Sequence, residues 1–317
     1  MLKYTIKRLV QSCITDLIVI TIVFLLLRML PTDYYFTEEQ LMKLTREQLD
    51  DQLRAAGLLD PPLVQLGRFY RQLARFDLGH SRRIQSGVPV TEVIGSKFYI
   101  SMRLGWISLA IAVVAGTAYG VVQAMNKGGF WDHVGTAYTV FVRAVPALVS
   151  YSLILILGSR MLNLPSLYST REVFRSSILP VVCLSLSSIA GYMVWTRRYM
   201  VDELNKDYIR LANLKGMSTR SVLYKHVLKN AFVPLAQYLP QSVLLVTGGS
   251  LLVERFFSVP GLGSLLTDAI LRYDLNLVQA LVMMYTAMGV VGLFLGDVLM
   301  VILDPRIRLT GKEGTTR

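Results

Sequence analysis

Charged residues are scarce in this chain. They make up 17% of its 317 residues, and hydrophobic residues make up 53%. About a quarter of an ordinary soluble domain is charged. A helix needs roughly 20 consecutive apolar residues to cross the hydrocarbon core of a bilayer, and several stretches meet this length. The lack of charge therefore argues against a soluble domain and predicts an all-α integral membrane protein.

Residues that carry covalent or metal chemistry are also few. The sequence has two cysteines and three scattered histidines. Cys13 and Cys183 both fall inside predicted spans, so we expect two small core residues rather than a disulfide or a metal pair. No stretch has the form GxxxxGK[ST] that cradles phosphates, and none reads HExxH. The sequence thus predicts no catalytic residue, no metal site and no cofactor bound by this chain.

The net charge of +12 suggests nucleic acid at first sight. Basic residues are not interleaved with aromatic ones, however, and no RNA-binding signature is present. In a membrane protein the position of Lys and Arg matters more than their number, because those near span ends stay cytoplasmic. We therefore expect the lipid bilayer, and no nucleic acid, as a partner.

Hydrophobic runs predict six transmembrane helices. The first follows the basic residues Lys3, Lys7 and Arg8 and could be a signal peptide. It is too long for one and lacks a small-residue cleavage site, so we expect a retained anchor. The six predicted spans are Leu9–Leu30, Leu104–Met125, Thr136–Ser159, Ile178–Thr196, Phe232–Val253 and Leu277–Leu303.

The distribution of basic residues predicts the orientation. An even number of spans places both termini on one side, together with Lys127 and the basic stretch 207–230. Residues 31–99, on the other side, hold nine basic and nine acidic residues. The positive-inside rule then predicts that the N-terminus, the C-terminus and the basic tail with Arg306 and Arg308 are cytoplasmic.

The predicted organisation has four parts. An N-terminal tip and first span cover residues 1–30, a helical extracytoplasmic segment 31–103, a core of five spans 104–303, and a cytoplasmic tail 304–317. In the outer segment, TEEQ at Thr37–Gln40 predicts a capping box and a helix ending at Gly57. Leu66, Phe69, Tyr70 and Leu73 predict a second amphipathic helix. The segment could be a cap on the spans, a docking surface for an external partner, or both.

The stretch DYIRLANLKGMSTRSVLYKHVLKN, residues 207–230, is basic yet keeps helical spacing. Gly216 permits a backbone turn, and Ser218 is placed to cap a second helix. Tyr208, Leu211 and Ala212 share one side of the first helix, and the stripe of Val222, Leu223 and Val227 lies on the second. Something must cover that stripe. A membrane-surface helix and a knob that fits a groove in a cytoplasmic protein both remain open.

This stretch resembles the EAA loop of ABC importer permeases, in the form found in the oligopeptide/dipeptide permease family. The opening LKYTIKRLVQS, the outer FDLGHS, VERFFSVPGLGSLL and the closing DPRIRL are also similar to that family, in the same order along essentially the whole chain. The resemblance implies a type I ABC importer fold in a bacterial or archaeal cytoplasmic membrane. It also implies a coupling helix between the fourth and fifth spans, within loop 197–231.

The resemblance further implies the partners and the coupling residues. The partners are a second homologous permease subunit, two ATP-binding subunits that hold ATP and Mg, and an extracytoplasmic substrate-binding protein. The generic glutamate of the loop is Arg210 here, its first alanine is Leu211, and a later proline is Lys229. The implied ATPase-coupling residues are Asp207, Tyr208, Arg210, Leu211, Ala212, Lys215, Gly216, Met217, Ser218 and Val222.

Polar and small residues inside the spans are candidates for the translocation path or its gate. A charge at mid-bilayer costs about 2.5–3.5 kcal/mol, so each should face protein or water. Asp297 is the exception, since it could simply pair within the bundle. For the others, helix packing and structural turns are the alternatives. The candidates are Arg143, Gln237, Gln241, Thr247, Glu254, Pro260 and Gly261.

The resemblance implies a short peptide as substrate, with nickel and oligosaccharides as alternatives within the same family. An ion-coupled secondary transporter would instead predict inverted repeats and matched intramembrane carboxylates in the two halves. The sequence shows no convincing repeat, and the large outer segment has no counterpart. The third hypothesis, beside an importer permease and a secondary transporter, is a structural or assembly membrane protein whose cytoplasmic helices merely lie on lipid.

Overall fold

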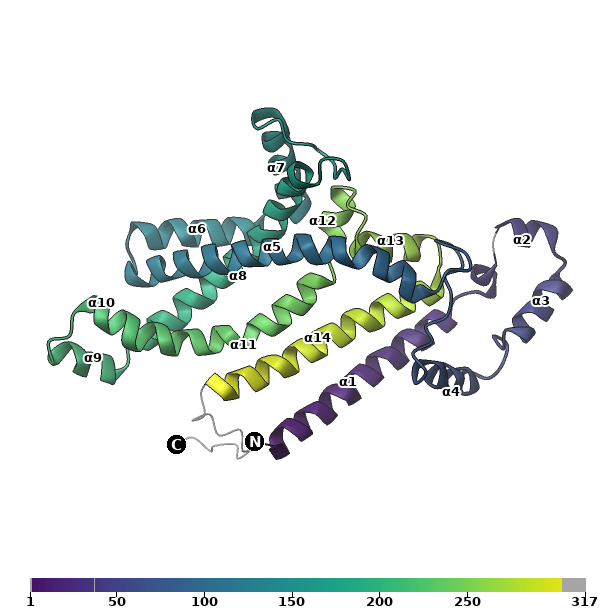
Figure 1. Cartoon of the computed structure of the whole chain (residues 1–317), viewed down its shortest axis with the longest axis horizontal. Coiled ribbons are helices and arrows are strands. Elements are labelled where there is room, and N and C mark those ends of the chain that lie inside the picture. The colour runs from purple at the N-terminus through teal and green to yellow at the C-terminus, as the bar shows by residue number, and fades with distance from the viewer. Residues whose placement is uncertain (1, 37, 304–317) are drawn as a thin grey trace.

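The structure, a computed structural model, describes residues 2–36 and 38–303, and within them every regular element is a helix. The predicted tail 304–317 and the capping residue Thr37 lie outside the described residues. Figure 1 shows long helices running side by side, with smaller helical groups at both ends of the molecule.

Within the described residues, four helices are long and apolar enough to cross a membrane: α1 (Leu2–Arg28), α5 (Val90–Met125), α8 (Val173–Leu204) and α14 (Leu275–Leu303). Each corresponds to one predicted span, and α1 ends two residues before the predicted Leu30. The predicted third span is divided between two bent helices, which bring the possible total within the described residues to five. The fifth prediction corresponds mainly to α11 (Leu228–Thr247), which carries two prolines and two glutamines. The count of six spans therefore stays a prediction.

The third predicted span is not continuous. It divides into two helices, α6 (Phe130–Ala144) and α7 (Ala147–Met161), and the chain bends by 110° between them. Pro146 has no N–H to continue the helix, and its ring forces the preceding residue out of helical geometry. Val145 accordingly has an extended backbone, with φ −81° and ψ 129°. The sequence had not predicted a break at this proline, and whether the two helices together form one span stays a prediction.

The fifth predicted span, Phe232–Val253, is also interrupted. Helix α11 ends at Thr247, and the short α12 (Leu251–Phe256) follows after Gly249, whose φ is +83°. A second break, around Pro260 and Gly261, precedes α13 (Leu262–Leu271). The predicted span therefore consists of most of α11 and the start of α12 rather than one continuous helix.

Small residues allow the long helices to approach closely. A side chain at Gly116 or Gly120 of α5 would place its Cβ 2.7 Å from an atom of α8, and one at Gly292 of α14 would lie 2.6 Å from Gln241 Cα of α11. Such contacts fit helix association in lipid, where small residues let backbones pack together. Helices α5 and α8 form one close pair, α11 packs on α14, and α14 packs on α1.

The outer segment holds α2 (Glu38–Lys43), α3 (Arg46–Ala55) and α4 (Pro62–Leu73). The prediction of one helix up to Gly57 was wrong, because Thr45 starts a new helix. Its side chain accepts from Gln48 N, and the Gln48 side chain accepts from Thr45 N, forming a capping box at this site. The predicted second helix is confirmed as α4, and Phe69 stacks on Phe24 of α1 with ring centroids 5.0 Å apart.

Asp274, just before α14, fastens the outer segment to the core. Its carboxylate accepts from Ser81 Oγ at 2.6 Å and from three successive backbone N–H groups of residues 82–84 at 3.0–3.1 Å. Burial alone raises the pKa of Asp274, but these hydrogen bonds outweigh that effect and hold the pKa below its ordinary value. The ionised carboxylate therefore stabilises this junction.

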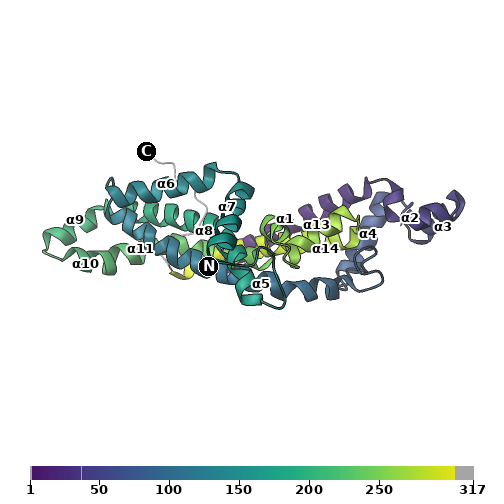
Figure 2. The ribbon, with the colours of Figure 1, turned by 90° about the horizontal axis from the view of Figure 1, so that it is seen from above.

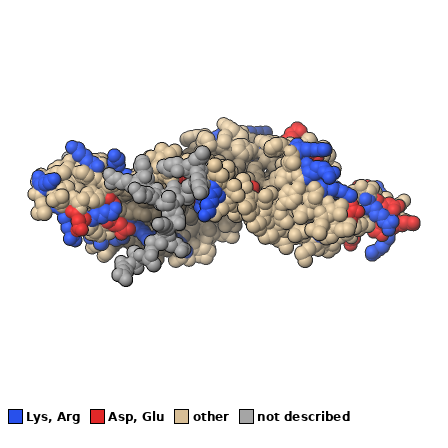
Figure 3. Space-filling model, turned by 90° about the horizontal axis from the view of Figure 1, so that it is seen from below, with Lys and Arg blue, Asp and Glu red and all other residues tan. Residues whose placement is uncertain are grey.

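The two ends of the molecule differ from the middle. Figure 2 shows α9 (Asp207–Leu214) and α10 (Thr219–Val222) at one end and α2 and α3 at the other. Charged side chains gather toward these ends, and the surface between them is mostly uncharged, as a membrane band requires (Figure 3). Cys183 is buried as expected, but Cys13 is exposed because α1 packs mainly along α14 and leaves a face uncovered.

Candidate coupling surface and translocation cavity

The basic stretch folds as a helical hairpin. Gly216 joins α9 to α10 with φ +78°, which confirms the predicted turn. No atom lies within 4 Å of the position of a Cβ on this glycine. The backbone conformation, rather than crowding within the chain, therefore calls for glycine. Ser218 Oγ accepts from Ser221 N at 3.4 Å, as predicted for the cap. A π-helical turn, Leu223–Val227, joins α10 to α11.

The inner side of the hairpin packs on its own chain. Val222 and Val227 are 3% and 0% exposed, and Ile209 and Ala212 of α9 are buried with them against Met200 of α8. The expectation that another protein or lipid must cover the predicted stripe was therefore wrong. Ala212 and Val222 therefore pack against their own chain, and their part in coupling stays a prediction. Ile209, which the sequence reading missed, is the most buried residue of α9.

The outer side of the hairpin presents apolar residues to the surroundings. Leu211, Leu214 and Tyr224 are 52%, 85% and 69% exposed. Only Leu211 was among the predicted coupling residues. Leu214 lies three positions further along α9, so helical spacing could have found it. The remaining predicted residues are at least partly accessible, and they are Asp207, Tyr208, Arg210, Lys215, Met217 and Ser218.

Glu203 at the end of α8 ties the hairpin to two helices. It accepts hydrogen bonds from Tyr208 Oη of α9 and, at 3.0 Å, from Asn230 Nδ2 of α11. Lys206 Nζ lies 2.6 Å from its other oxygen. The Glu203 side chain is 7% exposed, so these partners surround a buried charge. A displacement of α9 would therefore be transmitted directly to α8 and α11. Glu203 was not among the residues predicted from the sequence.

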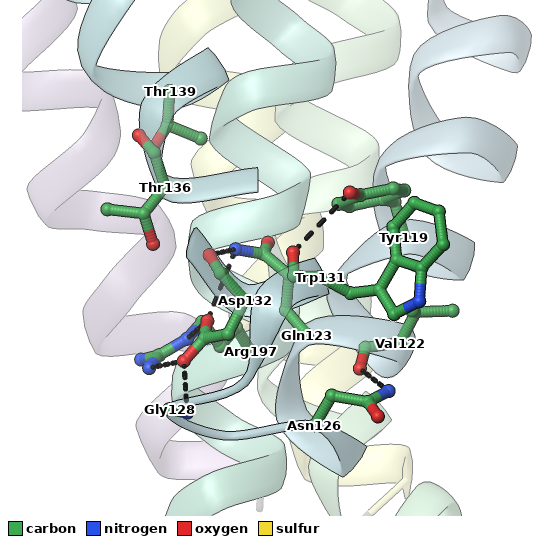
Figure 4. Close-up of polar contacts among 10 residues, drawn as sticks. All are labelled: Tyr119, Val122, Gln123, Asn126, Gly128, Trp131, Asp132, Thr136, Thr139 and Arg197. Atoms are coloured by element: carbon green, nitrogen blue, oxygen red, sulfur yellow. Dashed lines mark hydrogen bonds and ion pairs between the residues drawn. The ribbon is translucent and has the colours of Figure 1, made fainter. Parts of the chain in front are cut away.

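A second buried ion pair fixes the turn between α5 and α6 (Figure 4). Arg197 of α8 makes two hydrogen bonds to the Asp132 carboxylate, at 2.6 and 2.7 Å, and Gly128 N donates to the same group at 2.9 Å. The Gln123 amide of α5 lies beside them, 3.2 Å from Asp132 O. This two-pronged geometry links α5, α6 and α8 near the end that carries the hairpin.

A cavity of about 390 Å³ lies between α5, α8 and α11. Trp195 of α8 stacks on Tyr238 of α11 with ring centroids 5.6 Å apart, and Tyr192 Oη donates to Ser242 Oγ at 3.1 Å. The walls thus combine aromatic faces with hydroxyl groups inside otherwise apolar spans. None of these four residues was predicted from the sequence, although aromatic and hydroxyl side chains within spans could have indicated the lining of a path.

Glu254 lies at one end of this cavity and is 1% exposed. Its carboxylate accepts from Ser101 Oγ at 2.7 Å and from the backbone N–H groups of Gly263, Ser264 and Ser250 at 2.7–3.3 Å. A Cβ on Gly261 would overlap the carboxylate. Glu254 therefore links the chain segments before and after α12, and it also lines the cavity.

The other path candidates lie elsewhere. Gln237 Nε2 donates to Asp297 at 3.0 Å, and Arg8 Nε reaches the same carboxylate at 2.6 Å, which confirms that Asp297 pairs within the bundle. Gln241 packs against α14. Thr247 Oγ1 accepts from Trp106 Nε1 at 2.9 Å. Their part in a path, and that of the exposed Arg143 and the half-buried Pro260, stays a prediction.

Long apolar helices, a hairpin that faces outward at one end and a cavity between helices define a multi-pass membrane protein of the transport type. Residues 101–309 match the family described as binding-protein-dependent transport system inner membrane component, and the chain belongs to that family. It lies among the permeases of the oligopeptide/dipeptide type, as the sequence resemblance implies.

The sequence similarity to known permeases extends over nearly the full chain. The dipeptide transport system permease proteins of Bacillus subtilis (strain 168) and Lactococcus lactis subsp. cremoris are 31% and 32% identical to it. Each alignment covers 98% of this chain and 100% of the relative. The oligopeptide transport system permease protein of Escherichia coli (strain K12) is 30% identical over 97% of this chain and 100% of its own length.

Proposed function

We propose that this chain is one of two transmembrane subunits of an ATP-driven importer of dipeptides or oligopeptides. The full-length similarity to dipeptide and oligopeptide permeases carries the proposal. Two ATP-binding subunits hold ATP and Mg²⁺, and an extracytoplasmic binding protein delivers the peptide. In the complex, the hairpin faces the cytoplasm and the segment of α2–α4 faces outside.

In this mechanism the hairpin transmits movement of the ATP-binding subunits to the membrane helices. The hairpin exposes three large apolar side chains, Leu211, Leu214 and Tyr224, of the kind that fit a groove in a partner. Its inner side is packed on α8 and α11, and Glu203 adds polar links to both helices. An ATP-binding subunit that binds these exposed residues and then moves would displace the hairpin. Because the hairpin is packed on α8 and α11, these two helices, which line the cavity, would move with it.

The cavity supplies one half of the path. Its hydroxyl groups can exchange hydrogen bonds with any peptide backbone, and its aromatic faces accept side chains with little selectivity. Such walls suit a path through which peptides of varied sequence pass, with selection left to the binding protein. The second permease subunit closes the other side.

The experiment is reconstitution of the full complex in lipid nanodiscs. The chain is co-expressed with a second permease subunit and two ATP-binding subunits, purified and mixed with the binding protein. We expect ATP hydrolysis to rise when a short peptide is added and to remain at the basal rate with nickel ions or an oligosaccharide. Stimulation by nickel or the oligosaccharide alone would refute the peptide assignment. A chain that recruits no ATP-binding subunit would refute the importer mechanism.

A further inference from the structure

A polar hollow lies beside the hairpin, at the end of α8 and the last described turn of α14. Its volume is about 800 Å³, and its walls come from the last turns of α8, Lys206 after it, Tyr208 of α9, the π-helical turn, the first turns of α11 and the last described turn of α14. Helix α8 ends at Leu204, and the apolar run of α14 reaches Leu303, the last described residue. The hollow therefore lies at the depth of the phospholipid headgroups on the side that the proposed function makes cytoplasmic, and the inference rests on that orientation.

The charge of the hollow favours an anion. Lys225 and Lys229 lie one turn apart at its wall, and both are exposed. Within the part of the chain that the structure describes, neither lysine has a carboxylate partner. Two acidic residues also line the hollow, but Glu203 is already paired with Lys206. Among the described residues that line the hollow, three lysines, Lys206, Lys225 and Lys229, outnumber the two carboxylates, so the described walls carry an excess of positive charge.

An apolar groove continues from the polar hollow. The groove has a volume of about 160 Å³, and Lys229, Val233 and Leu303 line both spaces, so the two meet. Beyond them the groove is walled by Phe232 and Leu239 of α11 and by residues of α5. A positive pocket that opens into an apolar groove at the end of a span matches a headgroup with its acyl chain, whereas a free anion would use only the pocket.

We propose that this site binds an anionic phospholipid. The phosphate lies between Lys225 and Lys229, Tyr199 lines the headgroup region as aromatic residues do at membrane interfaces, and one acyl chain follows the groove past Phe232. Basic pockets between membrane helices on the cytoplasmic side are known to take such headgroups. A bound lipid would contact α8, α11 and α14 at the foot of the hairpin and so stabilise its position.

The test is native mass spectrometry of the full chain in mild detergent, with phosphatidylglycerol and phosphatidylcholine that carry the same acyl chains. We expect phosphatidylglycerol to be retained preferentially. The double variant Lys225→Gln/Lys229→Gln should weaken its binding roughly 30-fold, since each basic residue near an anionic surface contributes a factor of about five. The control Lys97→Gln/Lys127→Gln removes the same charge at positions that do not line the hollow and should bind like the unchanged chain.

A second arm separates a lipid from other anions. Phe232→Ser, at a side chain that is 39% exposed, should weaken long-chain phosphatidylglycerol but leave a short-chain form unaffected. Equal retention of the two lipids, no effect of the double lysine variant, or displacement by inorganic phosphate or an acidic peptide at equal concentration would overturn the proposal. Binding is measured without transport, so its failure leaves the importer assignment standing, and normal lipid binding by a chain that recruits no ATP-binding subunit would refute only that assignment.

Discussion

Gly216 offers a direct test of the hairpin. Its φ is +78°, and a Cβ at this position would meet no atom of the chain within 4 Å. The change Gly216→Val therefore adds backbone strain without a clash. The left-handed conformation costs an L-residue about 1–2 kcal/mol, which corresponds to a factor of roughly 5 to 30 in an equilibrium constant.

If the ATP-binding subunits recognise the hairpin in this conformation, the strain lowers the fraction of chains that can dock. The apparent affinity falls by the same factor. We expect Gly216→Val to weaken binding of the purified ATP-binding subunits roughly 5- to 30-fold, with the spans inserted normally because their hydrophobicity is unchanged. The measurement is a titration of fluorescent ATP-binding subunits against the permease pair in nanodiscs, followed by transport of a labelled peptide.

Gly216→Asn is the matched control, because asparagine tolerates the left-handed conformation better than other residues with a side chain. We expect its affinity to lie close to that of the unchanged chain. Normal binding by Gly216→Val would show that the partner does not depend on this geometry. An equal loss for Asn and Val would show that the partner needs the space beside the glycine rather than its backbone angle.

Three further predictions follow from where side chains lie. Leu214→Asp should abolish co-purification with the ATP-binding subunits while the amount of folded permease is unchanged, because a partner would have to desolvate the new charge. Val222→Asp should instead reduce the folded permease itself, seen by size-exclusion chromatography, since that side chain is 3% exposed; equal behaviour of the two variants would contradict the assigned faces. In a cysteine-free background, Ser86→Cys should react with an impermeant thiol reagent in intact cells and Ser218→Cys should not; labelling of the second alone would reverse the orientation. Asp274→Asn should loosen the outer segment at neutral pH, measured by hydrogen exchange. In the unchanged chain the same loosening should appear only in acid, as the pH falls through the lowered pKa of this carboxylate, and protection of Asp274→Asn at neutral pH equal to that of the unchanged chain would contradict it.

The choice of Ser86 follows from the structure. Ser81 lies in the same outer segment and would serve equally well on sequence grounds, but it is 1% exposed and donates to Asp274. A cysteine there would be shielded from the reagent and would disturb the junction. Ser86 is exposed, so its labelling reports topology alone.

The amino-acid sequence by itself determined the local features. Long apolar runs predict α1, α5, α8 and α14 because crossing a bilayer requires length and hydropathy, which are properties of one segment. The turn at Gly216 and the cap at Ser218 follow from residues a few positions apart. The breaks at Pro146 and Gly249 are equally local and could have been read from the sequence, but hydropathy alone had merged the helices on either side.

Only the tertiary structure decided which surface of each element is buried and which distant groups meet. The apolar stripe at Val222 could face lipid, a partner or the chain itself until α8 was placed beside it. Ser101 and Glu254 are 153 positions apart, and Ser81 and Asp274 are 193 apart. No local pattern encodes such pairs, because a buried carboxylate takes whatever donors the packing of the whole chain brings within hydrogen-bonding distance.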